Sequence, residues 1–330
     1  MRGLALALCA ALLSACAPSA AQAPIVDQWR AVAIETTLVE LGVAETGRLR
    51  FRGGLALSSS DVAFGGLSGL EIVGEGELVA VSDDGAWFEA QLMLDEAGAL
   101  IGLAHARMAL MRDETGEPFA NKRAGDAEAL AHLPDGRFAV AFEQTQSIRI
   151  YDLNRDGPFG AAQRGPRLAE VRRLPPNAGL EAMAADEDRA LIVGAEGGGG
   201  TTPLWRVALS AAEPAPPLAR LRLPVGYSLT SLDRLPDGGF VALQRFYAPV
   251  IGARARIVRI AADALRADAE VAGEEWATLA PPMPVDNFEG IAAVRTADGG
   301  TRLYIVSDDN FSARQRTLLY AFDVIEPRAD

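Results

Sequence analysis

Residues 128–143 read EALAHLPDGRFAVAFE: an acidic residue, an apolar segment, a Pro-Asp-Gly turn, a second apolar segment and a second acidic residue. Asp-Gly between two apolar segments is among the strongest sequence signals for a β-hairpin. Four other segments follow the same plan, from a small or acidic residue through two apolar segments joined by a turn to a charged residue: residues 68–83 (SGLEIVGEGELVAVSD), 181–196 (EAMAADEDRALIVGAE), 230–245 (TSLDRLPDGGFVALQR) and 289–308 (EGIAAVRTADGGTRLYIVSD). The five hairpins begin 49–60 residues apart, which indicates a repeat architecture.

Further strand-like segments follow each hairpin, for example residues 147–153, 168–174 and 317–324. This gives about four strands per repeat, the pattern of a propeller blade. We therefore predict an all-β fold, a β-propeller of about five four-stranded blades. Residues 47–57 precede the first hairpin and are expected to complete the last blade, closing the ring with an N-terminal strand. A strand at 36–41 leaves room for a sixth, irregular blade, and a pair of β-sandwiches is the alternative fold.

The composition narrows the classes of partner. The chain has 330 residues, is 49% hydrophobic and carries a formal net charge of −13. This charge argues against binding to nucleic acid or to an anionic membrane surface, and it is compatible with cations.

The N-terminus has the features of an export signal. Arg2 precedes an apolar run at residues 4–13, which is too short to span a membrane. The sequence LSAC at residues 13–16 resembles a bacterial lipobox, with Cys16 as the lipidated residue. We expect a signal peptide at 1–16, a flexible tether at 17–35 and one propeller domain at 36–330. The expected location is the periplasmic face of the outer membrane as a lipoprotein, or a soluble periplasmic or secreted form.

Acidic residues recur where the first strand of each hairpin begins and the second ends. These ends share one side of a propeller, so we expect seven carboxylates to converge there: Asp83, Glu128, Glu143, Glu181, Glu196, Glu289 and Asp308. We also expect Glu128 to face Glu143 across its hairpin, and likewise Glu181 to face Glu196 and Glu289 to face Asp308. Like charges in such pairs destabilise a sheet unless a proton, an arginine or a metal ion offsets them.

Carboxylate clusters suit hard cations, Ca²⁺ first and Mg²⁺ or Mn²⁺ next. Zinc is disfavoured because the chain has only two histidines. A hydrated acidic rim without a specific ion is the alternative.

The fourth hairpin departs from the pattern, because Arg245 stands where the others end in an acid. It is either a structural counter-ion for the carboxylates or a contact for an anionic substrate group. Lys122, Arg123 and Arg314 flank the second and fifth hairpins and are further candidates for binding an anion.

Three segments resemble the bacterial phytase-like proteins, a family labelled "esterase-like activity of phytase". They are NAGLEAM at 177–183, DNFEGI at 286–291 and VSDDNFS at 306–312 with QRTLL at 315–319. The resemblance covers residues 48–325 and implies a β-propeller with an acidic, cation-binding central face. Propeller phytases surround their calcium ions with many lysines and arginines, whereas this chain has one lysine. A smaller phosphoester is therefore a better candidate substrate than phytate.

Taken together, these features predict a Ca²⁺-dependent hydrolase of phosphoesters or related esters. Glu181 or Glu289 would position the attacking water and Arg245 would hold the anion. Two alternatives stay open: a non-enzymatic cell-envelope binding module with structural calcium, and a lactonase-like hydrolase. The expected partner is a small anionic ester, with membrane contact only through the lipid anchor.

Overall fold

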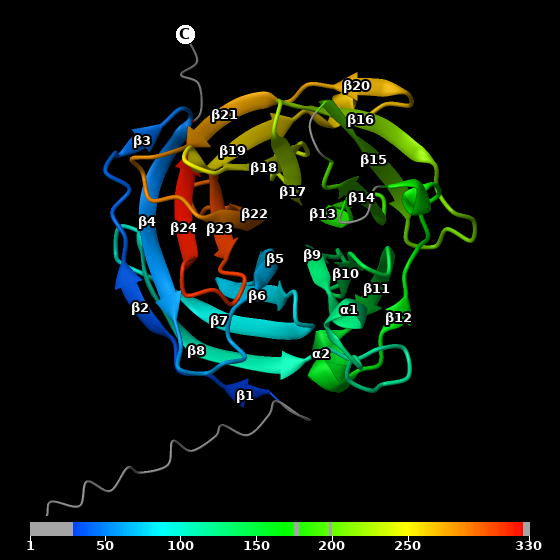
Figure 1. The fold of residues 1–330 in the computed structure, drawn as a ribbon, viewed down its shortest axis with the longest axis horizontal. Coiled ribbons are helices and arrows are strands. Elements are labelled where there is room, and N and C mark those ends of the chain that lie inside the picture. Colours follow the sequence, from blue (N-terminus) through cyan, green and yellow to red (C-terminus); the bar gives the residue numbers. More distant parts are fainter. Residues whose placement is uncertain (1–28, 175–177, 198–199, 326–330) are drawn as a thin grey trace, which may run out of the picture.

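The computed structural model describes residues 29–174, 178–197 and 200–325. The predicted signal peptide, Cys16 and residues 17–28 of the predicted tether lie outside the described residues. Five small sheets stand around a central channel and form a five-bladed β-propeller (Figure 1). Among the described residues, no helix is long and apolar enough to cross a membrane.

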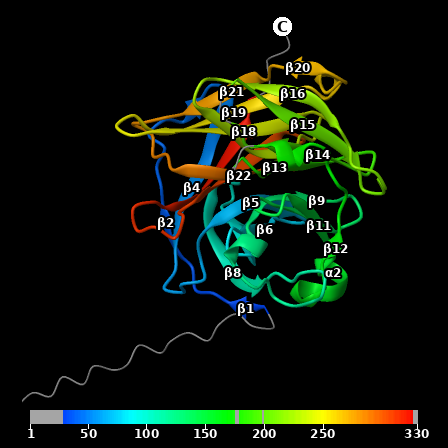
Figure 2. The ribbon, with the colours of Figure 1, turned by 45° about the vertical axis from the view of Figure 1, so that its right-hand side comes forward.

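Each blade runs from an inner strand at the channel to an outer strand at the rim (Figures 1 and 2). Blade 1 contains β5 (Leu67–Val73), β6 (Glu77–Ser82), β7 (Ala86–Leu94), β8 (Leu100–Leu110) and β1 (Arg30–Ala31). Blade 2 contains β9 (Ala127–His132), β10 (Phe138–Phe142), β11 (Ser147–Tyr151) and β12 (Gln163–Arg164). Blade 3 contains β13 (Leu180–Asp186), β14 (Ala190–Ala195), β15 (Gly200–Ala208), β16 (Pro217–Leu223) and β20 (Ala269–Val271).

Blade 4 contains β17 (Tyr227–Arg234), β18 (Phe240–Ala248), β19 (Gly252–Ile260) and β21 (Glu274–Leu279). Blade 5 contains β22 (Asn287–Arg295), β23 (Thr301–Asp308), β24 (Thr317–Val324), β4 (Leu49–Ser58) and β2 (Glu35–Leu38), and β3 (Glu45–Thr46) pairs with β4. The short helices are α1 (Lys122–Gly125) and α2 (Leu153–Asp156), with 3₁₀ turns at Gly157–Phe159, Val171–Arg173 and Ala262–Ala264. All pairings are antiparallel except that of β16 with β20.

The N-terminal strand closes the ring as predicted. β4 pairs with β24, so that Leu57 lies opposite Thr317 and Leu49 opposite Val324. The strand near residue 36 is the edge strand β2 of the same blade, so it does not start a sixth blade. Within the described residues, strand pairing starts at Arg30, because β1 pairs with β8. One expectation was wrong: the segment 168–174 contains a 3₁₀ turn in place of a strand.

The inner hairpins turn where the sequence predicts. In blade 2 the N–H of Leu133 donates to the carbonyl of Arg137 at 2.8 Å, and Gly136 has φ 86°. In blade 3 the equivalent residue is Arg189, which adopts the same left-handed region with φ 53°. The turn geometry is therefore kept in the one hairpin that lacks glycine at this position.

The hydrophobic core is divided into five clusters, one at each interface between neighbouring blades. Between blades 1 and 2, for example, Trp87 is fully buried and its ring contacts Phe138 and Tyr151 with centroids 6.0 and 5.2 Å apart. A blade cannot bury its two faces alone, so each blade depends on both neighbours. Ring closure therefore contributes to the stability of every blade.

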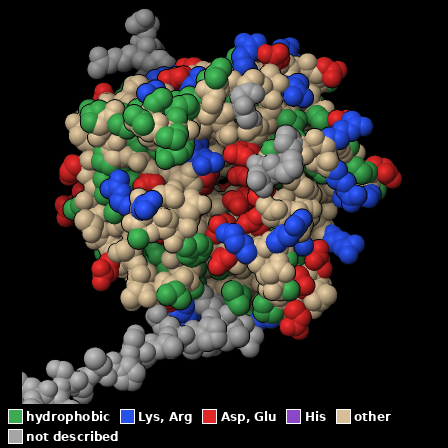
Figure 3. All heavy atoms as spheres, in the orientation of Figure 1, with side chains coloured by type: hydrophobic (Ala, Val, Ile, Leu, Met, Phe, Trp, Pro, Cys, Tyr) green, Lys and Arg blue, Asp and Glu red, His purple; other side chains and the backbone are tan. Residues whose placement is uncertain are grey.

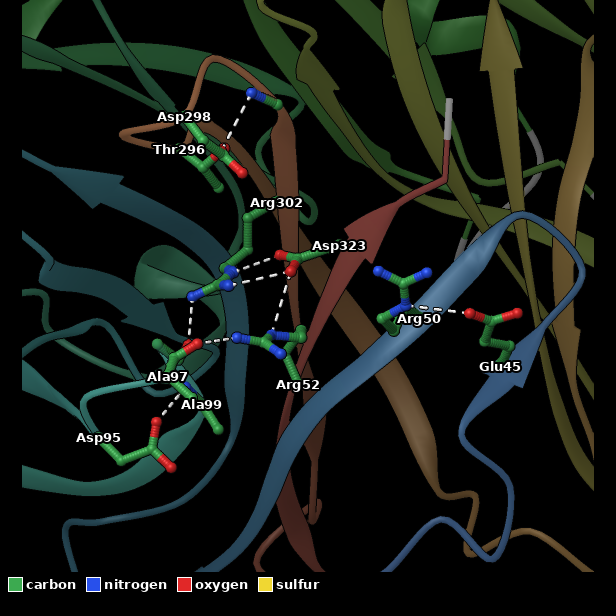
Figure 4. Close-up of polar contacts among 12 residues, drawn as sticks. Glu45, Arg50, Arg52, Asp95, Ala97, Ala99, Thr296, Asp298, Arg302 and Asp323 are labelled. Atoms are coloured by element: carbon green, nitrogen blue, oxygen red, sulfur yellow. Dashed lines mark hydrogen bonds and ion pairs between the residues drawn. The ribbon is translucent and has the colours of Figure 1, made fainter. Parts of the chain in front are cut away.

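Arginines reinforce the interface between blades 5 and 1 on the side of the propeller where the β22–β23 turn lies (Figure 4). Arg302 binds Asp323 through two nitrogens, at 2.6 and 3.1 Å, and donates to the carbonyl of Gly98 in the β7–β8 turn at 2.5 Å. Arg52 joins the same carboxylate at 3.0 Å and donates to the carbonyl of Ala97. These contacts tie strands of the last blade to a turn of the first.

Replacing Arg302 by alanine should therefore lower the free energy of unfolding by about 2 kcal/mol, because the side chain is 9% exposed and its charge-assisted hydrogen bonds are lost. The matched control is Arg50→Ala, which removes an exposed pair with Glu45 and should cost less than about 1 kcal/mol. Chemical denaturation measures both values. Equal losses in the two variants would show that the Arg302 contacts do not stabilise the closure.

Candidate active site: an acidic ring at the channel mouth

Every inner hairpin carries a β-bulge at the same place. The pairing shifts at the start of each inner strand, at Ser68 with Gly69, Glu128, Glu181, Thr230 and Glu289. A bulge leaves its residue out of the ladder and redirects the side chain. The recurring polar residue of the repeat is thus the bulged residue, at one end of the channel.

The expected cross-strand pairs were wrong by two residues: the hairpin loops have an odd number of residues, which shifts the pairing by one, and the bulge shifts it by one more. Asp308 lies opposite Asn287, and Arg245 lies opposite Ser228. In blade 2 the N–H of Glu143 donates to the carbonyl of Asp126 at 2.9 Å. Glu128 therefore does not face Glu143 directly. The same shift separates Glu181 from Glu196 and Glu289 from Asp308 in the ladder.

The carboxylates nevertheless converge. Figure 3 shows acidic side chains gathered in the centre of one face, with basic side chains around them. The electrostatic effects of these groups on one another's pKa link them into one set, which we call the acidic ring: Asp83, Asp126, Glu128, Glu143, Glu181, Glu196, Glu289 and Asp308. All seven predicted carboxylates belong to it.

Blade 2 supplies the densest part of this ring. One carboxylate oxygen each from Asp126, Glu128 and Glu143 lies within 4.8 Å of the others; we call these residues the acidic triad. Asp126 directly follows α1, whose first turn is capped by the side chain of Asn121. Burial, and next the charge of Glu143, raises the pKa of Asp126 to about 6. Burial, together with Asp126 and other carboxylates, raises the pKa of Glu128 well above its usual range.

Glu181 of blade 3 is buried among the other acids of the ring. Its residue is 9% exposed, and burial raises its pKa well above the usual range. The charged neighbours that contribute most after burial are carboxylates, Glu128 and Glu289 first. Its environment therefore favours a protonated carboxyl until a positive charge approaches.

Arg245 of blade 4 neutralises the opposite part of the ring. Its guanidinium lies 3.3 Å from Glu196 and 3.4 Å from Glu289, and it donates to the side-chain oxygen of Asn287 at 2.5 Å. Burial raises the pKa of Glu289 to about 8, although the charge of Arg245 acts in the other direction. These contacts favour the counter-ion interpretation of Arg245 that the sequence left open.

The first and fifth blades meet at Asp83 and Asp308. Lys122 pairs with Asp83, and burial raises the pKa of Asp308 to about 7. Among the described residues, no hydrogen-bond donor reaches Oδ1 of Asp83 or Oε2 of Glu289, although both atoms are buried. Arg123 and Arg314 are exposed, in α1 and in the β23–β24 loop beside the mouth.

Asp126 and Asn287 are site residues that sequence reasoning missed. Each stands two positions before a predicted acid, in DAE and in NFE. Residues two apart in a strand share a face, so this spacing was a usable signal. It was overlooked because the assumed register placed the pairs elsewhere.

The residues present fit a hard divalent cation. The triad offers oxygen ligands only, which suits Ca²⁺, Mg²⁺ or Mn²⁺. Its oxygens are close enough to share one ion, whereas Lys122 and Arg245 form their ion pairs with other acids of the ring. Lys122 and Arg245 reach one oxygen of Asp83 and of Glu289, and the second, buried oxygen of each carboxylate has no donor among the described residues.

Solved structures give distant matches. A protein provisionally assigned as a gluconolactonase is 12% identical, with 90% of this chain and 98% of that chain covered and a TM-score of 0.46. An aldose sugar dehydrogenase from Streptomyces coelicolor, solved in its PQQ-bound form, is 12% identical, with coverages of 88% and 99% and a TM-score of 0.41. Virginiamycin B lyase from Staphylococcus aureus is 11% identical, with coverages of 83% and 85% and a TM-score of 0.39. Likeness at this level says nothing about the chemistry of the acidic ring.

Sequence comparison identifies the family. No curated protein matches the chain significantly. The profile of the family described as "Phytase-like: Esterase-like activity of phytase" matches residues 62–311, which include all eight acids of the ring. This match spans most of the chain and confirms the resemblance seen in its motifs. The chain belongs to the phytase-like β-propeller family.

Proposed function

We propose that the acidic ring is the active site of a divalent-cation-dependent hydrolase that acts on phosphoesters or related anionic esters. The observation that carries the proposal is the acidic triad, where three carboxylate oxygens lie within 4.8 Å of one another. Like charges this close destabilise the fold unless protons or a cation offset them. The family match supports ester hydrolysis as the reaction class.

In this proposal Asp126, Glu128 and Glu143 hold the cation, with Ca²⁺ as the first candidate. The cation, when bound, would polarise an ester oxygen and neutralise developing negative charge. The chain's own residues supply the proton chemistry. Glu181 and Glu289 are the candidates for positioning water and accepting its proton, because burial raises the pKa of Glu181 well above its usual range and that of Glu289 to about 8.

The cations of the chain have different parts in this scheme. Arg245 holds Glu196 and Glu289 in place through its contacts at 3.3 and 3.4 Å. We assign binding of the anionic substrate group to exposed basic side chains at the rim. Lys122, Arg123 and Arg314 are the candidates, because α1 and the β23–β24 loop place them beside the mouth.

We further propose that the protein is exported and anchored through Cys16. The support is the sequence of residues 1–16 alone. A membrane-bound form would keep the active site accessible to small soluble esters, because the anchor and the propeller are separate parts of the chain.

Calcium should stabilise the protein through the acidic triad. A ligand at about 100 times its dissociation constant adds about 2.7 kcal/mol, which raises the melting temperature by several degrees. Asp126→Asn should remove most of this increase, because one ligand charge is lost. The matched control is Glu213→Gln, an exposed acid in the β15–β16 loop. An equal response to calcium in Asp126→Asn and the wild type would contradict the metal site.

The metal-free protein should lose stability as pH rises from 5 to 8. Folding raises the pKa of Asp126 to about 6, of Asp308 to about 7 and of Glu289 to about 8, in each case mainly through burial. In this window the folded state binds more protons than the unfolded state, so the free energy of unfolding falls with increasing pH. Carboxyls with a lowered pKa, such as Asp61 and Asp135, titrate below this window.

Thermal melts in chelator at pH 5, 6, 7 and 8 measure this decline, and Glu289→Gln should make it shallower. Added calcium should counteract the decline, because the cation binds deprotonated carboxylates. A metal-free protein as stable at pH 8 as at pH 5 would show that burial of the acids is not costly.

Hydrolysis should depend on both the cation and the buried acids. We expect p-nitrophenyl phosphate to be turned over with calcium and not in excess chelator. Glu181→Gln or Glu289→Gln should lower kcat by about 10²–10⁴-fold while Glu213→Gln leaves it unchanged. Turnover that persists in chelator would refute the mechanism, and calcium-dependent stability without turnover on a broad ester panel would favour a binding module.

A further inference from the structure

The loop between β23 and β24 has an unusual backbone beside the acidic ring. Asn310 and Phe311 both have φ 49°, in the left-handed region that residues other than glycine seldom adopt. Carboxylates hold this conformation: the N–H of Asn310 donates to Asp308 at 2.6 Å, and that of Phe311 donates to Asp309 at 3.1 Å. The position of Phe311 is therefore fixed by the acids at the mouth. Strained backbone of this kind is concentrated at functional sites.

The Phe311 ring lies over two glycines and beside acidic side chains. Gly65 and Gly66 beneath it have φ 146° and 62°, and Gly66 donates to Asp309 at 3.1 Å. A Cβ placed on Gly66 would lie 2.6 Å from Cε2 of Phe311 and 2.2 Å from Oδ1 of Asp83. The edge of the ring and the carboxylate of Asp83 are thus neighbours. The positive edge of an aromatic ring suits this contact.

The other side of Phe311 faces open space. The residue is 41% exposed and lines a cleft of about 590 Å³ between the segments 56–64 and 309–317. Leu57, Val62 and Phe64 form an apolar wall of the cleft, and Val62 is 87% exposed. The rest of the cleft lining is polar and includes Ser58, Gln315 and Arg316. An aromatic side chain that lies between this apolar wall and the acidic ring is suited to contact an organic group whose reacting end lies at the ring.

We propose that Phe311 determines substrate specificity, with its exposed ring contacting the aromatic or apolar organic group of the anionic ester. In this arrangement the organic group of the ester binds in the cleft, and the anionic part of the ester lies at the acidic ring. The proposal rests on the proposed function for the reaction itself. It deepens that function by naming the substrate class: esters with an aromatic or apolar organic group rather than small or fully polar ones.

The test compares two probes with the same head and different organic groups, phenyl phosphate and methyl phosphate. Calorimetric titration of the calcium-loaded protein should show tighter binding of phenyl phosphate. Phe311→Ala should weaken phenyl phosphate binding about tenfold and leave methyl phosphate binding unchanged. Phe311→Tyr keeps the ring and should retain the preference, and Val225→Ala, which shortens a 92% exposed side chain in another loop, should change neither value. Melting curves confirm that each variant is folded.

Phosphate-release kinetics supply a second readout. In Phe311→Ala the KM for phenyl phosphate should rise with little change in kcat, because the ring does not touch the reacting atoms. Equal binding of the two probes by the wild type, or equal weakening of both in Phe311→Ala, would overturn the proposal. A phenyl preference that depends on Phe311 in a protein without turnover would support the binding role of Phe311 and refute the hydrolase.

Discussion

The narrow channel of a five-bladed ring is the constraint on which the rest of this structure depends. The inner strands approach so closely that a Cβ on Gly290 would lie 2.4 Å from the carbonyl oxygen of Ser68, and one on Gly69 would lie 2.6 Å from the backbone nitrogen of Leu130. Inner strands are sheet edges, so some of their backbone groups need partners from the neighbouring blade. Glu71 accepts from the N–H of His132 at 2.8 Å, and Asp233 accepts from that of Ala293 at 2.6 Å. Polar side chains in the channel thus hold blades together.

The short distances between the inner strands also bring like charges together at the channel mouth. Five bulges bring polar residues to one end of a channel too narrow to keep them apart. Burial raises the pKa of Glu128, Glu181 and Glu289 because ionisation is costly without a nearby positive charge. A set of acids that is partly protonated near neutral pH can exchange protons for a cation, which links the occupancy of the site to its acid–base state.

Sequence periodicity predicts the fold well because the hairpin signal is local. The Asp-Gly turns, the blade spacing and the N-terminal closing strand follow from short segments and from the need to pair edges. The detailed geometry of the site does not follow. The sequence marks neither the odd loop length nor the bulge in an Ala-Glu-Ala segment, so the register was misjudged by two residues and Asp126 was missed. Phe311 was also missed, since its backbone conformation depends on hydrogen bonds to Asp308 and Asp309 that the chain makes only when folded.

The departure of blade 4 from the repeat explains why, within the described residues, some acids of the acidic ring are paired with a basic side chain and others are not. Where the other hairpins present an acid, blade 4 presents Arg245, which neutralises Glu196 and Glu289 on its own side of the channel. Lys122 does the same for Asp83. One carboxylate oxygen each from Asp126, Glu128 and Glu143 lies within 4.8 Å of the others, and the charge of Lys122 offsets only part of the effect of burial on the pKa of Asp126. Lys122 stands in α1, the helix directly before Asp126, yet it forms its ion pair with Asp83. The triad thus offers the oxygen ligands that hard cations prefer, which is why we propose it as the cation site.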